Sequence, residues 1–141
     1  MARAPLLEIS DATVFLCTDK VLTHIYLRIL HGAHLAIHAT NGAGKTTTLR
    51  AISGLLKPEN GFIKDGTVVF NGADITNVMG TQVVRLSAVM VPEGRRVFKH
   101  LSLEENIQHD SITRNDSSQN VKKDVRLMYK HFPRLALFSN R

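Results

Sequence analysis

The most informative segment of this chain is Ala39-Thr40-Asn41-Gly42-Ala43-Gly44-Lys45-Thr46. It matches the phosphate-loop pattern G-x-x-x-x-G-K-[ST], except that Ala39 occupies the first glycine position. An apolar run at 35–39 precedes the stretch, and residues 45–56 place apolar side chains at helical spacing. Because a strand, a glycine-rich loop and a helix in this order are the context that the pattern requires, the stretch predicts an anion-binding loop.

The residue types in this loop suit the chemistry of a phosphate tail. Backbone N–H groups from Asn41 to Lys45 can point at anionic oxygens, and Gly42 and Gly44 permit the close backbone that this needs. The Lys45 ammonium would bridge the β- and γ-phosphates of a nucleotide, and the Thr46 hydroxyl would ligate Mg²⁺. The candidate binding residues are Asn41, Gly42, Ala43, Gly44, Lys45, Thr46 and Thr47.

Around the loop, the sequence predicts an α/β layer fold. Apolar patterning predicts strands at 7–15, 24–29, 35–39, 67–70 and 88–91. Helical spacing predicts helices at 45–56, 82–86 and 121–132, and Ser102 with Glu105 forms a capping box that opens another. The final helix is expected to bury Val121, Val125, Met128 and Phe132. Tight turns are predicted at 31–33 and 71–72, and a polar loop at 113–120.

Composition disfavours several classes of protein. The net charge of +6 is spread along the 141 residues, and aromatic residues are only 6%, so a nucleic-acid partner is not expected. The single cysteine, Cys17, excludes an internal disulfide framework and has no evident activating base. His31, His34 and His38 fall in a predicted turn and strand, which does not form a metal-binding face. No uncharged apolar run approaches the ~20 residues of a membrane span.

Several segments together resemble one family. Residues 41–49 look like the phosphate loop of an ABC-transporter ATPase, and 52–58 and 70–76 resemble the segments that follow it in that family. Residues 91–98, Val-Pro-Glu-Gly-Arg-Arg-Val-Phe, with 101–106, resemble the Q-loop segment of the ATP-binding subunit of branched-chain amino acid importers. Most ABC ATPases carry glutamine where Glu93 stands. The similarity extends from about Leu7 to Leu135.

The resemblance implies a RecA-like P-loop NTPase core with an antiparallel β-subdomain. In that fold the strand-rich start is 7–39, the phosphate loop and its helix are 39–56, and a strand with the Q-loop-like segment is 66–99. Residues 102–141 would begin a helical subdomain. The ligand would be ATP with Mg²⁺, and Glu93 would lie near the γ-phosphate and share the Mg²⁺ with Thr46.

The resemblance also implies partners and a place in the cell. ATP would bind between this chain and a second ATP-binding subunit, and its hydrolysis would drive transport of branched-chain amino acids. The segment 92–99 would contact the transmembrane permease subunits. We therefore expect a cytoplasmic protein, peripheral on the inner face of the plasma membrane, without a membrane span of its own.

Three residues depart from the family pattern. The family stacks adenine on an aromatic side chain where this chain has Leu16, and Phe15 could replace it only if the loop shifts. His38 stands where the family has an apolar strand residue. Ala39 replaces a glycine, which is unstrained only where its φ is negative.

The sequence ends at Arg141, before the family's signature motif, Walker B strand, catalytic glutamate and switch histidine. We therefore expect residues 1–141 to be the N-terminal part of one ATP-binding domain. Two alternatives to a transport ATPase remain open: a truncated nucleotide- or phosphate-binding module without hydrolysis, and a structural remnant that does not bind. The base-reading motif N-K-x-D of Ras-like GTPases is not present in the sequence.

The 141 residues should not hydrolyse ATP. No aspartate at the end of an apolar strand supports the Mg²⁺, and no general base follows it. A phosphate-release assay with Mg-ATP should give the same background rate for this chain and for Lys45→Ala. Phosphate release that depends on Lys45 would contradict this expectation.

Overall fold

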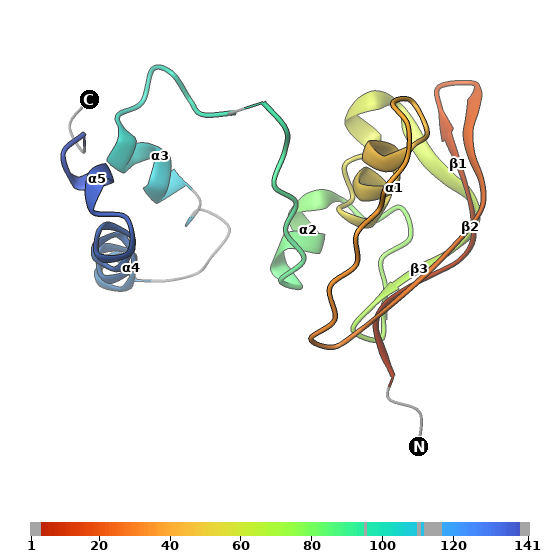
Figure 1. Cartoon of the computed structure of the whole chain (residues 1–141), viewed down its shortest axis with the longest axis horizontal. Helices are drawn as coiled ribbons and strands as arrows, with labels where there is room; N and C mark the ends of the chain where they lie inside the picture. The colour runs from red at the N-terminus through yellow and green to blue at the C-terminus, as the bar shows by residue number, and fades with distance from the viewer. Residues whose placement is uncertain (1–3, 95, 110, 112–116, 139–141) are drawn as a thin grey trace. The chain divides into compact units, whose positions relative to one another are not determined.

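The computed structural model describes residues 4–94, 96–109, 111 and 117–138. The chain divides into two compact units, Met1–Met90 and Val91–Arg141. The first unit holds all the strands of the described residues, and the second holds only helices and connecting segments (Figure 1).

The first unit is built on an antiparallel sheet with the strand order β2-β1-β3-β4. Its strands are β1 (Pro5–Leu16), β2 (Asp19–Leu30), β3 (Gly61–Phe70) and β4 (Ala73–Asp74). The strands predicted at 7–15, 24–29 and 67–70 are confirmed, and each is longer than expected. The turn at 71–72 is confirmed too, since Asn71 and Gly72 adopt φ values of 48° and 80°, the left-handed pair that tight hairpins need.

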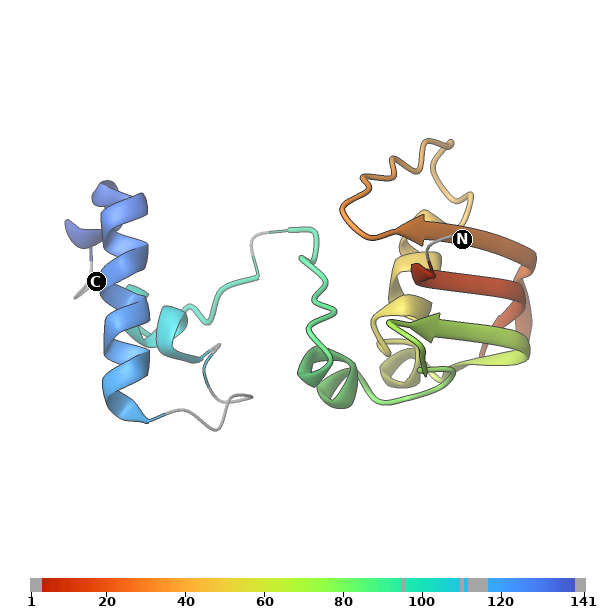
Figure 2. The same ribbon diagram turned by 90° about the horizontal axis from the view of Figure 1, so that it is seen from below.

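One face of the sheet packs against α1 (Lys45–Ile52), with η1 (Lys57–Glu59) and α2 (Gly80–Arg85) completing the unit (Figure 2). Alternate residues of the strands supply the core because successive side chains point to opposite faces. The buried cluster consists of Leu7, Ile9, Ala12, Val14, Leu22, Ala51, Leu56, Ile63, Val68, Ile75 and Val83.

Helix α1 is shorter than the predicted 45–56 and ends at Ile52. Gly54 adopts φ +68°, and Leu55 N–H donates to the Arg50 carbonyl at 2.9 Å across this turn. A glycine in the left-handed conformation ends a helix in this way. The helix predicted at 82–86 is confirmed as α2.

The strands predicted at 35–39 and 88–91 are wrong. Neither segment is in a strand, and no described strand pairs with them. Leu35 and Ile37 are 51% and 41% exposed, and Val89 is 71% exposed. An apolar run forms a strand only where a neighbouring strand accepts and donates its backbone hydrogen bonds, and the described residues offer none.

The second unit contains α3 (Leu103–His109), α4 (Ser118–His131) and α5 (Pro133–Ala136). The predicted capping box is confirmed: Ser102 N–H donates to Glu105 Oε2 at 2.8 Å, and Glu105 N–H donates to Ser102 Oγ at 3.3 Å. Helix α4 begins three residues earlier than the predicted 121, so 118–120 are not loop; 113–116 lie outside the described residues.

The expected core face of α4 is only partly correct. Val125 is buried at 5% exposure, whereas Met128 and Phe132 are 38% and 55% exposed. Within the described residues, no helix is long and apolar enough to cross a membrane.

Two matched substitutions test whether the buried cluster contributes more to stability than the segment 35–39, which pairs with no described strand. Ile75→Ala should lower the free energy of unfolding by about 2–5 kcal/mol, because Ile75 is 1% exposed and its removal leaves a cavity. Ile37→Ala should change it far less, because Ile37 is 41% exposed. Urea unfolding measures both, and equal losses would contradict the described packing of 35–39.

Candidate phosphate-binding site

The predicted binding loop connects the sheet to α1. Gly42 and Gly44 adopt φ values of +83° and +92°, which residues with a Cβ rarely adopt. Ala39 is not among the described non-glycine residues with positive φ. Alanine in the first glycine position is therefore free of the backbone strain that a positive φ would bring.

Gly44 also lies close to a side chain of the sheet. A Cβ on Gly44 would lie 2.3 Å from Cδ2 of Leu22, a buried residue of β2. The carbonyl of Gly44 accepts from Thr48 N–H at 2.8 Å and from Thr48 Oγ1 at 3.0 Å. These contacts join the last residue of the loop to the edge strand and to the first turn of α1.

The Lys45 side chain folds back over the loop. Its Nζ donates to the carbonyls of Ala39 and Thr40, both at 2.7 Å. Ala43 N–H donates to the Thr40 carbonyl at 3.3 Å, which tightens the same turn. The ammonium thus lies against the loop that the sequence assigns to phosphate.

The beginning of α1 adds donors without acceptors. In the part of the chain that the structure describes, the N–H groups of Lys45, Thr46 and Thr47 donate to no backbone carbonyl. Such amides carry the positive end of the helix dipole. Three amides, an ammonium and the exposed Thr46 hydroxyl form a donor set that fits an anionic group with its Mg²⁺.

The seven predicted residues, 41–47, therefore form one continuous loop and first turn. Glu93 lies at an exposed bend in the second unit, beside Gly94 at φ +91°. Thr46 belongs to the first unit, so a Mg²⁺ shared by Thr46 and Glu93 stays a prediction.

The three histidines at 31, 34 and 38 are all exposed. His38 lies in the irregular segment that was predicted as a strand. The described residues contain no group of three or more histidine, cysteine or acidic side chains that could hold a metal ion. Cys17 is exposed, with its Sγ 3.9 Å from the Glu59 carbonyl oxygen.

An acid–histidine pair on the sheet was not predicted, because no sequence pattern signals it. Asp11 Oδ1 and His24 Nδ1 are 2.6 Å apart, and both residues have positive φ, at 54° and 52°. Hydrogen bonds from His24 and then Tyr26 hold the pKa of Asp11 below its usual range. The Asp11 hydrogen bond raises the pKa of Tyr26 in turn. The pair joins β1 and β2 where their register shifts.

The Asn106 side chain binds the backbone at the end of the segment 92–99, which the family resemblance predicts to contact the permease subunits. Its Oδ1 accepts from Phe98 N–H at 2.8 Å. Its Nδ2 donates to the carbonyls of Phe98, Leu101 and Ser102 at 3.0, 3.1 and 2.9 Å. This side chain fixes the backbone at 98–102 against α3.

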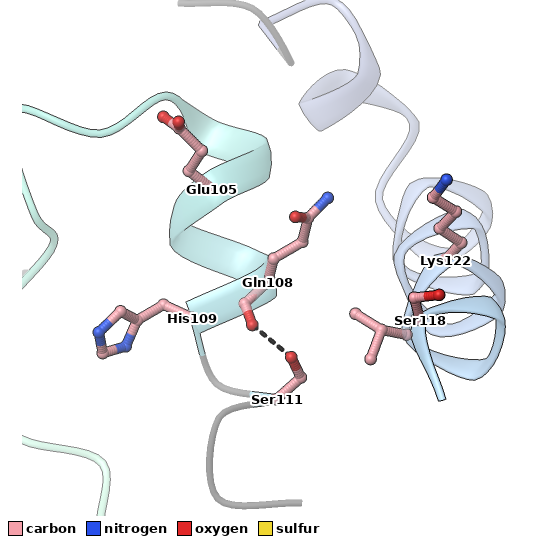
Figure 3. Close-up of a pocket in the computed structure, with 7 residues that line it drawn as sticks. Glu105, Gln108, His109, Ser111, Ser118 and Lys122 are labelled. Carbon is pink, nitrogen blue, oxygen red and sulfur yellow. Dashed lines mark hydrogen bonds between the residues drawn. The ribbon is translucent and has the colours of Figure 1, made fainter. Parts of the chain in front are cut away.

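A cavity of about 420 Å³ lies between α3 and α4 (Figure 3). It is lined by Glu105, Gln108, His109, Ser111, Ser118, Val121 and Lys122. Four of these side chains already have partners. Ser111 Oγ donates to the Gln108 carbonyl at 2.6 Å, and Gln108 Nε2 donates to Glu104 Oε1 at 3.0 Å. Glu105 caps α3 through Ser102, and the His109 ring centroid lies 4.5 Å from that of Phe98. The cavity contains none of the predicted site residues.

Comparisons of the sequence and of the structure with known proteins agree on one family. Residues 22–138 match the sequence pattern of the ABC transporter family. A branched-chain amino acid transport ATP-binding protein, BraG of Pseudomonas aeruginosa, is 29% identical over 116 residues, which cover 82% of this chain and 47% of that protein. The Fe(3+) ions import ATP-binding protein FbpC of Escherichia coli O157:H7 is 26% identical, covering 91% and 36%. The spermidine/putrescine import ATP-binding protein PotA of Legionella pneumophila is 30% identical, covering 86% and 31%.

Solved structures agree on the fold. A nucleotide-free ATP-binding cassette from an ABC transporter superposes with a TM-score of 0.75 at 21% identity, covering 98% of this chain and 57% of that one. An ATP-binding subunit of an ABC transporter gives 0.74 at 25% identity, covering 95% and 52%. The chain therefore spans about half the length of these structures, and less than half of the curated relatives.

The capping box can be tested by titration. Donation from the Ser102 N–H and then its hydroxyl lowers the pKa of Glu105 from its ordinary 4.5. The stabilising effect is therefore present above the unfolded-state pKa and is lost as the pH falls through the lowered folded-state pKa. In a carbon-detected NMR titration, Ser102→Ala should raise the pKa of Glu105, and the matched Ser118→Ala should not. A Glu105 pKa at or above its ordinary value in the unaltered chain would contradict the described bonds.

Proposed function

The chain belongs to the ABC transporter family, and on that premise we propose that it is an ATP-binding subunit of a transporter, or a part of one, that binds Mg-ATP at residues 41–47. The observation that carries the proposal is the donor set at the start of α1. Lys45 Nζ lies 2.7 Å from two loop carbonyls, and the amides of residues 45–47 lack backbone acceptors among the described residues.

Binding would exchange the partners of Lys45. The ammonium now donates to the neutral carbonyls of Ala39 and Thr40, and phosphate oxygens are stronger acceptors because they are charged. The amides of residues 45–47, which donate to no backbone carbonyl among the described residues, would gain phosphate acceptors at the same time. The Thr46 hydroxyl would hold the Mg²⁺, which when bound neutralises phosphate charge. Glu93 would complete the Mg²⁺ environment or orient a water molecule.

The transported solute is the finer part of the proposal. The residues 91–98, Val-Pro-Glu-Gly-Arg-Arg-Val-Phe, favour a branched-chain amino acid importer. Among the relatives, BraG is named for branched-chain amino acid transport, whereas FbpC and PotA are named for iron and polyamine import. Relatives of similar identity therefore differ in solute, and the support for branched-chain amino acids comes from this segment.

The proposed partners follow from the same role. A second ATP-binding subunit would share the nucleotide, and permease subunits would contact the segment 92–99, whose Val97 and Phe98 are 63% and 46% exposed. Asn106 would support that contact because it fixes the backbone at Phe98. The protein would then act in the cytoplasm, at the inner face of the plasma membrane.

Two other functions remain as alternatives. A binding module without hydrolysis would hold Mg-ATP through Lys45 and release no phosphate. A structural remnant would keep the loop conformation without binding a nucleotide. Lys45 would then only stabilise the loop, through its hydrogen bonds to the carbonyls of Ala39 and Thr40.

Isothermal titration calorimetry with Mg-ATP tests the proposal. Lys45→Ala should weaken binding by about tenfold or more, because hydrogen bonds to charged groups contribute about 1.5–3 kcal/mol each. The matched control is Lys64→Ala, which removes the same charge on the sheet face where Lys64 Nζ lies 5.5 Å from the Phe15 ring centroid. This control should bind as the unaltered chain does. Equal heats for the unaltered chain and Lys45→Ala would contradict the proposal and favour the remnant.

A further inference from the structure

Helix α4 of the second unit has an apolar side that is only partly covered. Val121, Val125, Met128 and Phe132 follow one another at spacings of four, three and four residues, which places them on one side of the helix. Val125 is 5% exposed, whereas Met128 and Phe132 are 38% and 55% exposed. The same side of the helix is therefore buried near its middle and open to solvent toward its C-terminal end.

The exposed apolar surface continues into α5, which follows α4 directly (Figure 1). Phe132 joins the two helices: its N–H donates to the Met128 carbonyl at 2.8 Å, and its carbonyl accepts from Leu135 N–H at 2.9 Å. Leu137, just after α5, is 76% exposed. Single exposed apolar residues are ordinary on a protein surface. Here three large ones, Met128, Phe132 and Leu137, lie in one short segment, 128–137, and are exposed together.

The α4–α5 segment also carries most of the net charge of the chain. Residues 118–138 contain five basic residues and one acidic residue, so this segment holds +4 of the net +6. Lys123, Arg126 and Lys130 follow one another at spacings of three and four residues, on the side of α4 opposite to its apolar side. The five basic residues are all exposed: Lys122, Lys123, Arg126, Lys130 and Arg134.

We propose that α4 and α5 bind the surface of a lipid bilayer with anionic headgroups. An amphipathic helix with basic residues on one side and large apolar residues on the other is typical of this contact. Met128, Phe132 and Leu137 enter the boundary between headgroups and acyl chains. Lys130 and Arg134 reach the lipid phosphates, because their long apolar stems can lie along the boundary while the charged ends stay outside it.

The charge of the segment selects this partner over a second copy of the chain. A second copy would bring the same +4 to the contact, and like charges repel, whereas anionic lipid brings the opposite sign. The inference goes beyond the proposed function, because the lipid is bound by the second unit without a permease and without a nucleotide.

Co-sedimentation of the full chain with vesicles tests the inference. One set of vesicles contains phosphatidylcholine alone, and the other contains phosphatidylcholine and phosphatidylserine in equal parts. The chain should sediment with the anionic vesicles and stay in solution with the others. Added salt should weaken the binding, because it screens the attraction between the cations and the headgroups.

Two variants separate the charged from the apolar part of the contact. Lys130→Gln together with Arg134→Gln should weaken binding by about fivefold for each cation removed. Leu137→Ser should weaken it by about tenfold, because the side chain no longer enters the apolar boundary. The matched controls are Lys57→Gln and Leu35→Ser, which make the same changes at exposed positions of the first unit and should bind as the unaltered chain does.

Three outcomes would overturn the inference. The first is equal binding, or no binding, with both kinds of vesicle. The second is binding to anionic vesicles that the variants at 130, 134 and 137 leave unchanged, since another surface then binds the lipid. The third is self-association in sedimentation velocity that Leu137→Ser abolishes, without vesicle binding, which would assign the apolar residues to a second copy. Each outcome leaves the proposed binding of Mg-ATP intact, because calorimetry tests that site separately.

Discussion

The packing of α1 against the inner face of the sheet is the constraint on which the first unit depends. Val14 and Val68 are 1% and 0% exposed, and they share a buried cluster with Ala51 of α1. Gly44 meets Leu22 of β2 at the other end of the helix. Because the helix is held at both ends, its first turn and the loop before it have a defined position relative to the strands. Burial of aliphatic side chains thus places a polar site.

In the first unit, the positive charge of the loop, on Lys45, already has hydrogen-bond partners within the loop. The Lys45 ammonium binds two carbonyls, so a phosphate must compete with acceptors that the chain already supplies. Those carbonyls are neutral, and within the described residues the amides of residues 45–47 donate to no backbone carbonyl. The balance favours an anion, because charged acceptors form the stronger hydrogen bonds.

Local patterns were predictable from the sequence, and features that need a distant partner were not. The glycine-rich loop, the Ser102–Glu105 capping box and the Asn71-Gly72 turn each depend on residues a few positions apart. The runs at 35–39 and 88–91 look like strands because they are apolar, but a strand also needs a neighbour to pair with. The Asp11–His24 pair joins residues on facing strands at a change of register, which no sequence period signals. The four hydrogen bonds of Asn106 likewise depend on the fold of 98–106.

An NMR titration of the ¹⁵N-labelled chain with Mg-ATP tests whether the loop before α1 binds phosphate. If the loop and the first turn of α1 are the binding site, the amide resonances of residues 41–47 should shift most, because their N–H groups gain charged acceptors. The amides of the sheet face that holds Phe15 and Phe62 should stay in place. Shifts that are absent from 41–47, or that are largest elsewhere in the chain, would contradict the assignment of this loop to phosphate.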